Sequence, residues 1–158
     1  MNRHAVVALL ALSLIAACSR GEPEAQAPAL GYTGTPDLYQ NETPELRALI
    51  EHHAETKQVP VELVQRVILR ESHHRPRARN GPYQGLMQIH PQTARTMGYD
   101  GNPEGLLDPD TNLRYATRYL RGAWMLADGS HEEAVKWYAR GYYYEARRRG
   151  MLEATGLR

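Results

Sequence analysis

Glu71 is the residue in this sequence whose position most clearly suggests chemistry. It lies four residues after Val67 and three after Ile68, so in a helix it projects from the same face as these apolar side chains. Burial on such a face disfavours the charged carboxylate and raises its pKa, which suits a general acid that protonates a leaving oxygen. The same position also suits a carboxylate paired with a nearby arginine, and the pattern alone leaves both interpretations open.

Other kinds of reactive site are not indicated. The adjacent pairs His52-His53 and His73-His74 point apart on a helix, whereas zinc ligands recur at spacings such as i and i+4. The chain contains neither a glycine-rich phosphate loop nor a Ser/His/Asp order typical of hydrolases. We therefore expect no metal and no cofactor.

A second carboxylate beside Glu71 would indicate an ordinary retaining glycosidase. The candidates are Asp100, Asp108, Asp110 and Glu145. Asp108 precedes a proline at an expected helix start and should act as its cap, and Asp110 should interact with the dipole of the same helix. Because there is no obvious second carboxylate, attack by a hydroxyl of the substrate itself fits better than hydrolysis.

The elements that must position Glu71 are helices. Five segments combine a cap or proline with apolar residues at helical spacing, and they begin near Thr43, Val59, Pro91, Asp108 and Ser130. The last of them is expected to carry Trp137, Tyr138 and Tyr142 on one helix that ends near Gly150. No segment shows sustained strand alternation, although the loop before Gly85 suits a small β-hairpin. The sequence predicts a mainly α fold.

The N-terminus is typical of an export signal. A basic start is followed by an uncharged apolar run that is too short to span a bilayer, and by small residues before Cys18. Ile15-Ala16-Ala17-Cys18 resembles the bacterial lipobox, in which the cysteine is lipid-modified; an ordinary signal peptide is the alternative. We predict a signal over residues 1–18, a flexible tether over 19–40 and a domain over 41–158. The protein should be lipid-anchored in the cell envelope on the periplasmic side, and Ser19 after the cysteine favours the outer membrane.

The charge balance argues against a nucleic-acid partner. The chain has 19 Lys and Arg against 18 Asp and Glu, and one of the basic residues belongs to the expected signal. Two arginine clusters stand out, one over residues 75–79 and one over 147–149. Each suits either a solvated surface or attraction to an anionic polymer.

Several motifs in order resemble the lytic transglycosylase family of lysozyme-like enzymes. They are Glu71-Ser72, Gly85-Leu86-Met87-Gln88-Ile89, Pro91-Gln92-Thr93-Ala94, Leu107-Asp108-Pro109 with Asn112, Tyr119-Leu120, and Trp137-Tyr138-Ala139-Arg140-Gly141. The resemblance implies a lysozyme-like helical domain around a groove for peptidoglycan. It also implies non-hydrolytic cleavage of the bond between N-acetylmuramic acid and N-acetylglucosamine, with 1,6-anhydromuramoyl ends as the product.

The resemblance also assigns roles to individual residues. It places Glu71 as the acid and then the base, and Tyr138 beside the reacting sugar. The glycan is expected to meet Ser72, Met87, Gln88, His90, Trp137 and Tyr138, with Met87 mainly packing the floor of the groove.

The chain departs from the family pattern in two places. His90 replaces a usual methionine, and Tyr138-Ala139-Arg140-Gly141 stands where the family usually has Tyr-Asn-Ala-Gly, so the asparagine is lost at Ala139. The tyrosines at 142–144 could compensate by stacking on sugars, or could simply pack in the core. A lysozyme-type hydrolase and a non-catalytic peptidoglycan-binding lipoprotein are therefore the alternative functions.

Overall fold

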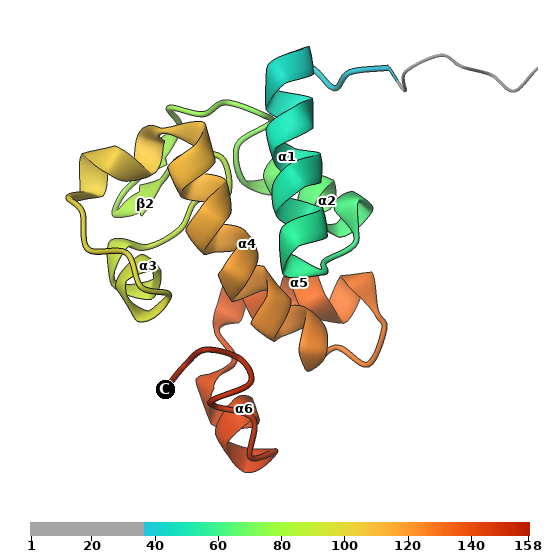
Figure 1. Cartoon of the computed structure of the whole chain (residues 1–158), viewed down its shortest axis with the longest axis vertical. Helices are drawn as coiled ribbons and strands as arrows, with labels where there is room; N and C mark the ends of the chain where they lie inside the picture. The colour runs from blue at the N-terminus through green and yellow to red at the C-terminus, as the bar shows by residue number, and fades with distance from the viewer. Residues whose placement is uncertain (1–36) are drawn as a thin grey trace, which may run out of the picture. The chain divides into compact units, whose positions relative to one another are not determined.

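The computed structural model describes residues 37–158, and these are mainly helical, as predicted (Figure 1). The expected signal, Cys18 and most of the expected tether lie outside the described residues. The elements in chain order are α1 (Pro44–Lys57), α2 (Val61–Glu71), β1 (Arg79–Asn80), β2 (Tyr83–Gln84), α3 (Pro91–Thr96), the 3-10 helix η1 (Pro103–Leu107), α4 (Pro109–Met125), α5 (His131–Arg140) and α6 (Tyr143–Arg148). None of the helices within 37–158 has the length and apolar character needed to cross a membrane.

The helix starts follow from local capping. The Thr43 hydroxyl accepts a hydrogen bond from the Leu46 N–H at 3.2 Å, and the Asp108 carboxylate accepts one from the Thr111 N–H at 2.8 Å. Ser130 caps α5 in the same way, at 3.3 Å from the Glu133 nitrogen. The predicted capping role of Asp108 is thus confirmed, and its carboxylate serves the start of α4.

The prediction of one continuous helix from Ser130 to Gly150 is wrong, because this segment forms two helices. α5 ends at Arg140, and Gly141 adopts φ 84° and ψ 151°, a conformation that essentially only glycine reaches. α6 then begins at Tyr143. Tyr142 keeps the apolar spacing expected of one continuous helix because its ring still enters the core, but the backbone turns at Gly141 to place it there.

α4 is the central element, and its buried face is made of Leu113, Ala116, Leu120 and Ala123. α1 and α5 pack against it, while η1 and α3 contact it as well. Figure 1 shows α4 crossing the domain with α1 along one side and α3 and β2 on the other. α2 contacts both α1 and α5, so its orientation is fixed from two sides.

The predicted β-hairpin is present between α2 and α3. It is a two-stranded antiparallel ribbon in which Arg79 lies opposite Gln84 and Asn80 lies opposite Tyr83. A further bridge pairs Gln84 with Ile89, which folds the following turn back onto the hairpin. The turn over residues 85–88 is thereby held close to the C-terminal end of α2.

Candidate active site

Glu71 is the last residue of α2, at the point where the chain leaves the helix. The next residue, Ser72, still donates its backbone N–H to the Ile68 carbonyl at 2.9 Å. His73 and His74 then adopt φ of 52° and 58°, which few non-glycine residues do and which turns the chain sharply. The Glu71 side chain therefore projects from a helix end and is not covered by a following helical turn.

A buried polar network fixes this turn from beneath. The Gln65 side chain donates to the Glu42 carboxylate at 2.7 Å and bonds a His74 ring nitrogen at 2.6 Å. Arg47 completes the network with two hydrogen bonds to Glu42, at 2.6 and 2.8 Å. The segment before α1 is therefore tied to the residues that directly follow Glu71.

The Glu71 carboxyl is only partly accessible to solvent. Its side chain is 24 % exposed, and the Arg70 Nε lies 3.5 Å from its Oε1. Burial raises the pKa of Glu71 above its ordinary value, and the charge of Arg70 offsets part of that rise. The arginine pairing considered from the sequence is thus present, yet desolvation is the stronger influence.

Two adjoining pockets form a groove beside Glu71. The acid pocket, of about 320 Å³, is lined by Arg70, Glu71, Asn80, Tyr83, Gln88, Tyr138 and Ala139. The adjoining pocket, of about 250 Å³, shares the last four of these and extends along Ile89, His90, Thr93, Tyr119, Arg140 and Gly141. Glu71 is the only carboxylate among the residues that line this groove.

Gln88 presents an acceptor to the groove. Its side-chain amide donates to the backbone carbonyls of Gly85 and Ala78, at 2.8 and 3.1 Å, so both N–H groups are used internally. No described residue donates to its Oε1. A sugar hydroxyl could therefore donate to Gln88, and the glycan contact of this residue stays a prediction.

Tyr138 lines the acid pocket together with Glu71, and its hydroxyl proton is already engaged. The O–H donates to the Met87 carbonyl at 2.8 Å. Burial raises the pKa of Tyr138 well above its ordinary value, and the nearby Glu71 charge adds to the rise. Because a phenol has one proton, Tyr138 can only accept a further hydrogen bond, from protonated Glu71 or from a sugar hydroxyl.

Met87 and Ser72 do not line the groove. Both are wholly buried, and the Ser72 hydroxyl donates to the Ile68 carbonyl at 3.4 Å. The Met87 sulfur accepts a hydrogen bond from Thr117 at 3.7 Å, and its backbone holds Tyr138 in place. Met87 therefore packs beneath the groove as expected, whereas the structure gives Ser72 a supporting place at the helix end.

His90 lies in the adjoining pocket and also caps α3. Its Nδ1 accepts the Gln92 N–H at 3.1 Å, which leaves Nε2 as the protonated nitrogen of the neutral ring. Its ring meets Tyr83 edge-on, with centroids 5.7 Å apart. This departure from the family pattern thus places a polar ring at the groove.

Ala139, the second departure from the family pattern, lines the groove, whereas the neighbouring Trp137 does not. Ala139 is exposed and lines both pockets, so the missing asparagine side chain leaves open space there. Trp137 lies outside the groove, with the Arg140 guanidinium 3.9 Å from its ring centre. The structure therefore does not bring Trp137 together with Glu71, Gln88 and Tyr138.

Several groove residues were not singled out from the sequence. Tyr83 lies in the hairpin, 44 % exposed, and Tyr119 contacts the Tyr138 ring edge-on at 5.4 Å. Asn112, which appeared only within a motif, is wholly buried and supports the Met87 backbone. Pairing of the hairpin brings Tyr83 to the groove. The two strands have only four residues together, so the sequence gives little indication of this pairing.

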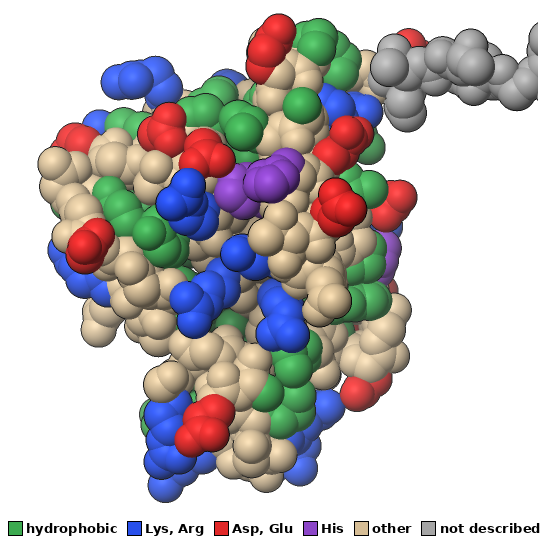
Figure 2. Space-filling model, viewed as in Figure 1, with side chains coloured by type: hydrophobic (Ala, Val, Ile, Leu, Met, Phe, Trp, Pro, Cys, Tyr) green, Lys and Arg blue, Asp and Glu red, His purple; other side chains and the backbone are tan. Residues whose placement is uncertain are grey.

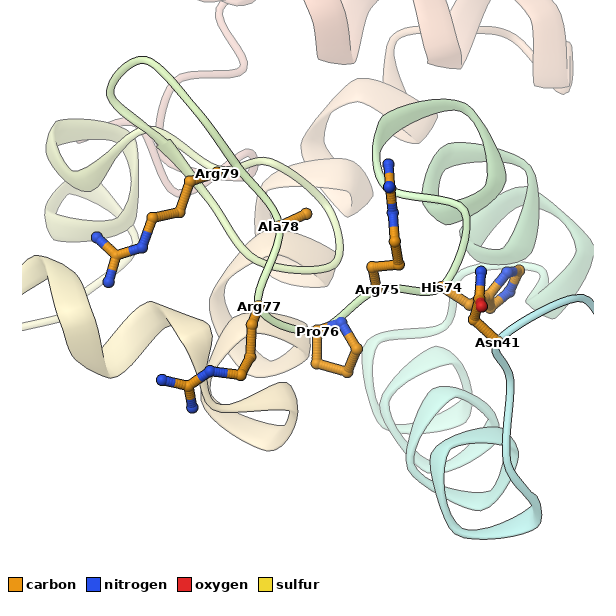
Figure 3. A pocket seen from close by; sticks show the side chains of 7 residues that line it. All are labelled: Asn41, His74, Arg75, Pro76, Arg77, Ala78 and Arg79. Atoms are coloured by element: carbon orange, nitrogen blue, oxygen red, sulfur yellow. The ribbon is translucent and has the colours of Figure 1, made fainter.

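The arginine cluster of residues 75–79 does not converge on one point (Figure 3). Arg75 donates to the Ser72 carbonyl at 2.8 Å, and Arg79 lies 3.8 Å from Glu104. These residues line a separate pocket of about 590 Å³ with Asn41 and His74, and Figure 3 shows Arg77 and Arg79 extending to the same side and Arg75 pointing away from them. The solvated-surface interpretation fits this cluster better than an anion site.

Comparison with known proteins agrees with this geometry. The family model described as the transglycosylase SLT domain matches residues 48–150, which contain Glu71, the hairpin, the groove and α4 to α6. Searches of curated proteins and of solved structures give no match. Because the family model covers more than half of the chain, the protein belongs to the transglycosylase SLT domain family of the lysozyme-like superfamily, a lytic transglycosylase type that acts on peptidoglycan.

Proposed function

We propose that this protein cleaves the β-1,4 bond between N-acetylmuramic acid and N-acetylglucosamine without water, leaving 1,6-anhydromuramoyl ends. The observation that carries the proposal is the environment of Glu71. It is the single carboxylate lining the groove, its charged form is disfavoured by burial, and it shares the acid pocket with Tyr138. A carboxyl that keeps its proton to higher pH is suited to protonate a leaving oxygen.

The proposed reaction uses Glu71 twice. Protonated Glu71 gives its proton to the glycosidic oxygen while the bond from this oxygen to C1 of the muramoyl sugar breaks. The resulting carboxylate then takes the proton of the C6 hydroxyl as O6 bonds to C1, so Glu71 ends protonated again. Gln88 and Tyr138 both offer oxygen acceptors here, which suits the holding of sugar hydroxyls or of the protonated acid.

The hydrolytic alternative has less support. A retaining glycosidase would need a second carboxylate about 5 Å from the first. Asp108 caps α4, while Asp110 bonds His53 at 2.8 Å and Arg114 at 3.0 Å. Neither lines the groove, which favours attack by the substrate's own hydroxyl.

Product analysis tests the proposal. The full chain, purified in detergent, is incubated with peptidoglycan, and the released ends are identified by mass spectrometry. Anhydro ends are expected; reducing ends would instead establish a lysozyme-type hydrolase, and retained binding without release would establish a non-catalytic binding protein. Glu71→Gln should abolish cleavage without loss of fold, while Glu62→Gln, an equal charge change at an exposed site of α2, should not.

We further propose that the protein is a lipoprotein held in the cell envelope through Cys18, with Ser19 favouring the outer membrane. Support for this comes from the sequence of the first 18 residues alone. Cys18→Ala should release the protein from the membrane fraction. Unchanged membrane association of that variant would refute the lipid anchor.

A further inference from the structure

Another pocket meets the groove at Arg140 and Gly141 and extends toward α6. This aromatic pocket, of about 470 Å³, is lined by Trp137, Arg140, Gly141, Tyr142, Tyr143, Tyr144, Glu145 and Arg148. Arg140 and Gly141 line the adjoining pocket of the groove as well, so the two spaces meet at these residues. A substrate bound beside Glu71 can therefore extend along the groove, past Arg140, into the aromatic pocket.

Arg140 has no acidic partner among residues 37–158, although it is an exposed cation at the junction. Its guanidinium lies over the Trp137 ring at 3.9 Å. Stacking of this kind uses the flat face of the guanidinium and restrains the side chain, while its N–H groups around the edge stay free. Those edge donors match the two oxygens of a carboxylate.

The charges around Arg140 do not cancel its own. Glu145 is the one acid lining the aromatic pocket, and it already accepts bonds from Arg148 at 2.6 and 2.8 Å and from Arg149 at 2.6 Å. Figure 2 shows Lys and Arg side chains gathered at the α6 end of the domain. The pocket is therefore net positive at the point where it joins the groove.

The aromatic residues beside Arg140 are also exposed. Tyr144 is 82 % and Tyr143 is 46 % exposed, and their rings meet edge-on with centroids 5.4 Å apart. Tyr142, by contrast, is buried and donates its hydroxyl to the Tyr119 carbonyl at 2.8 Å. Of the three consecutive tyrosines, one packs in the core, as considered from the sequence, and two present polar-tipped rings that suit a peptide chain.

We propose that Arg140, stacked on Trp137, binds a carboxylate of the peptide that the glycan strand carries, so the protein prefers strands whose peptides have free carboxylates. The inference rests on the proposed function, because it places the strand in the groove beside Glu71. Arginine occupies the position where the family's usual Tyr-Asn-Ala-Gly has alanine, so this preference belongs to the present chain. Arg140 acts here as a specificity determinant and takes no part in bond cleavage.

Binding, measured separately from turnover, tests this preference. The full chain carrying Glu71→Gln is titrated in detergent by calorimetry with a peptide-bearing glycan fragment, before and after its peptide carboxylates are converted to amides. We expect the free carboxylates to tighten binding about tenfold, the scale of one well-placed charge-assisted bond, and the difference to shrink with added salt. Arg140→Ala should remove the difference while binding of the amidated fragment stays within about twofold.

Two further variants make the result specific. Arg140→Lys keeps the charge but loses the planar fork, so it should retain only part of the preference. Arg147→Ala removes an equal charge from an exposed site outside the pocket and should retain the full preference. The inference would be overturned if Arg140→Ala weakened binding of both fragments equally, or if the Glu71→Gln chain bound the two fragments with equal affinity. Either result would leave the proposed function intact. Failure of both fragments to bind the Glu71→Gln chain would overturn both.

Discussion

Asn112 offers a direct test of how the groove floor is held. This residue of α4 is wholly buried, and its side chain reaches three other segments. Its amide donates to the carbonyls of Gln84 and Leu106, both at 2.8 Å, and its oxygen accepts the Met87 N–H at 3.0 Å. Asn112→Ala would leave one buried backbone donor and two buried acceptors without these partners.

The magnitude follows from the Met87 N–H and the Leu106 carbonyl, because the Gln84 carbonyl still accepts the Ile89 N–H at 3.1 Å. Leaving a buried polar group unsatisfied costs about 1–3 kcal/mol, and water entering the vacated space would compensate in part. We expect a loss of roughly 3–5 kcal/mol in the free energy of unfolding. Since small domains have about 5–15 kcal/mol in total, the variant should fold but unfold at much lower denaturant.

Urea unfolding followed by tryptophan fluorescence measures the loss. Wild type, Asn112→Ala and Asn80→Ala are compared; Asn80 is an exposed asparagine whose side chain makes no hydrogen bond to the described residues. The control should change the free energy of unfolding by less than about 0.5 kcal/mol. A loss below about 1 kcal/mol for Asn112→Ala would refute the view that this side chain fastens the groove floor.

Three further predictions concern charge and backbone. Hydrogen bonds outweigh burial and lower the pKa of Glu42 from 4.5 to about 2. The ionised Glu42 carboxylate therefore contributes fully to the free energy of unfolding above pH 4.5, and this contribution is lost as the pH falls to 2. In urea unfolding across this range, the stability difference between wild type and Glu42→Gln should narrow by about 3 kcal/mol, and a constant difference would contradict the assignment. Arg70→Ala removes a charge that lowers the pKa of Glu71, so the alkaline fall of kcat/KM should move to higher pH; an unmoved limb would show that Arg70 does not affect the acid. Gly141→Ala should cost about 1–3 kcal/mol in thermal or urea unfolding, because alanine fits φ 84° and ψ 151° poorly, and a cost near zero would mean that the turn can relax.

Most of the helical fold could be predicted from local features of the sequence. Thr43, Asp108 and Ser130 each cap a helix where the sequence placed a start, because capping depends on residues three positions apart. The partial burial of Glu71 was also foreseeable, because the spacing to Val67 and Ile68 sets its helix face. Predictions of this kind succeed because their physical causes lie within one turn of helix.

Longer-range packing decided what the sequence did not reveal. Ser72 is wholly buried in the packed domain, and pairing of the hairpin brings Tyr83 into the pocket that Glu71 and Tyr138 line. Tyr142 preserved the apolar period although Gly141 breaks the helix, because a side-chain pattern does not report a single backbone reversal. These outcomes depend on which segments meet in space.

Glu42 and Glu71 show why one carboxylate suits acid chemistry and the other does not. Both lose solvent in the fold, but Glu42 accepts hydrogen bonds from Arg47, from Gln65 and from a backbone N–H, and these hold its pKa near 2. Glu71 accepts none from the described residues and has only Arg70, at 3.5 Å, to favour its charge. Burial without donors favours the protonated form, whereas burial with donors favours the ion. Glu42 is therefore fixed as a structural anion beneath the turn, and Glu71 at the groove is the carboxyl free to give up a proton and take it back.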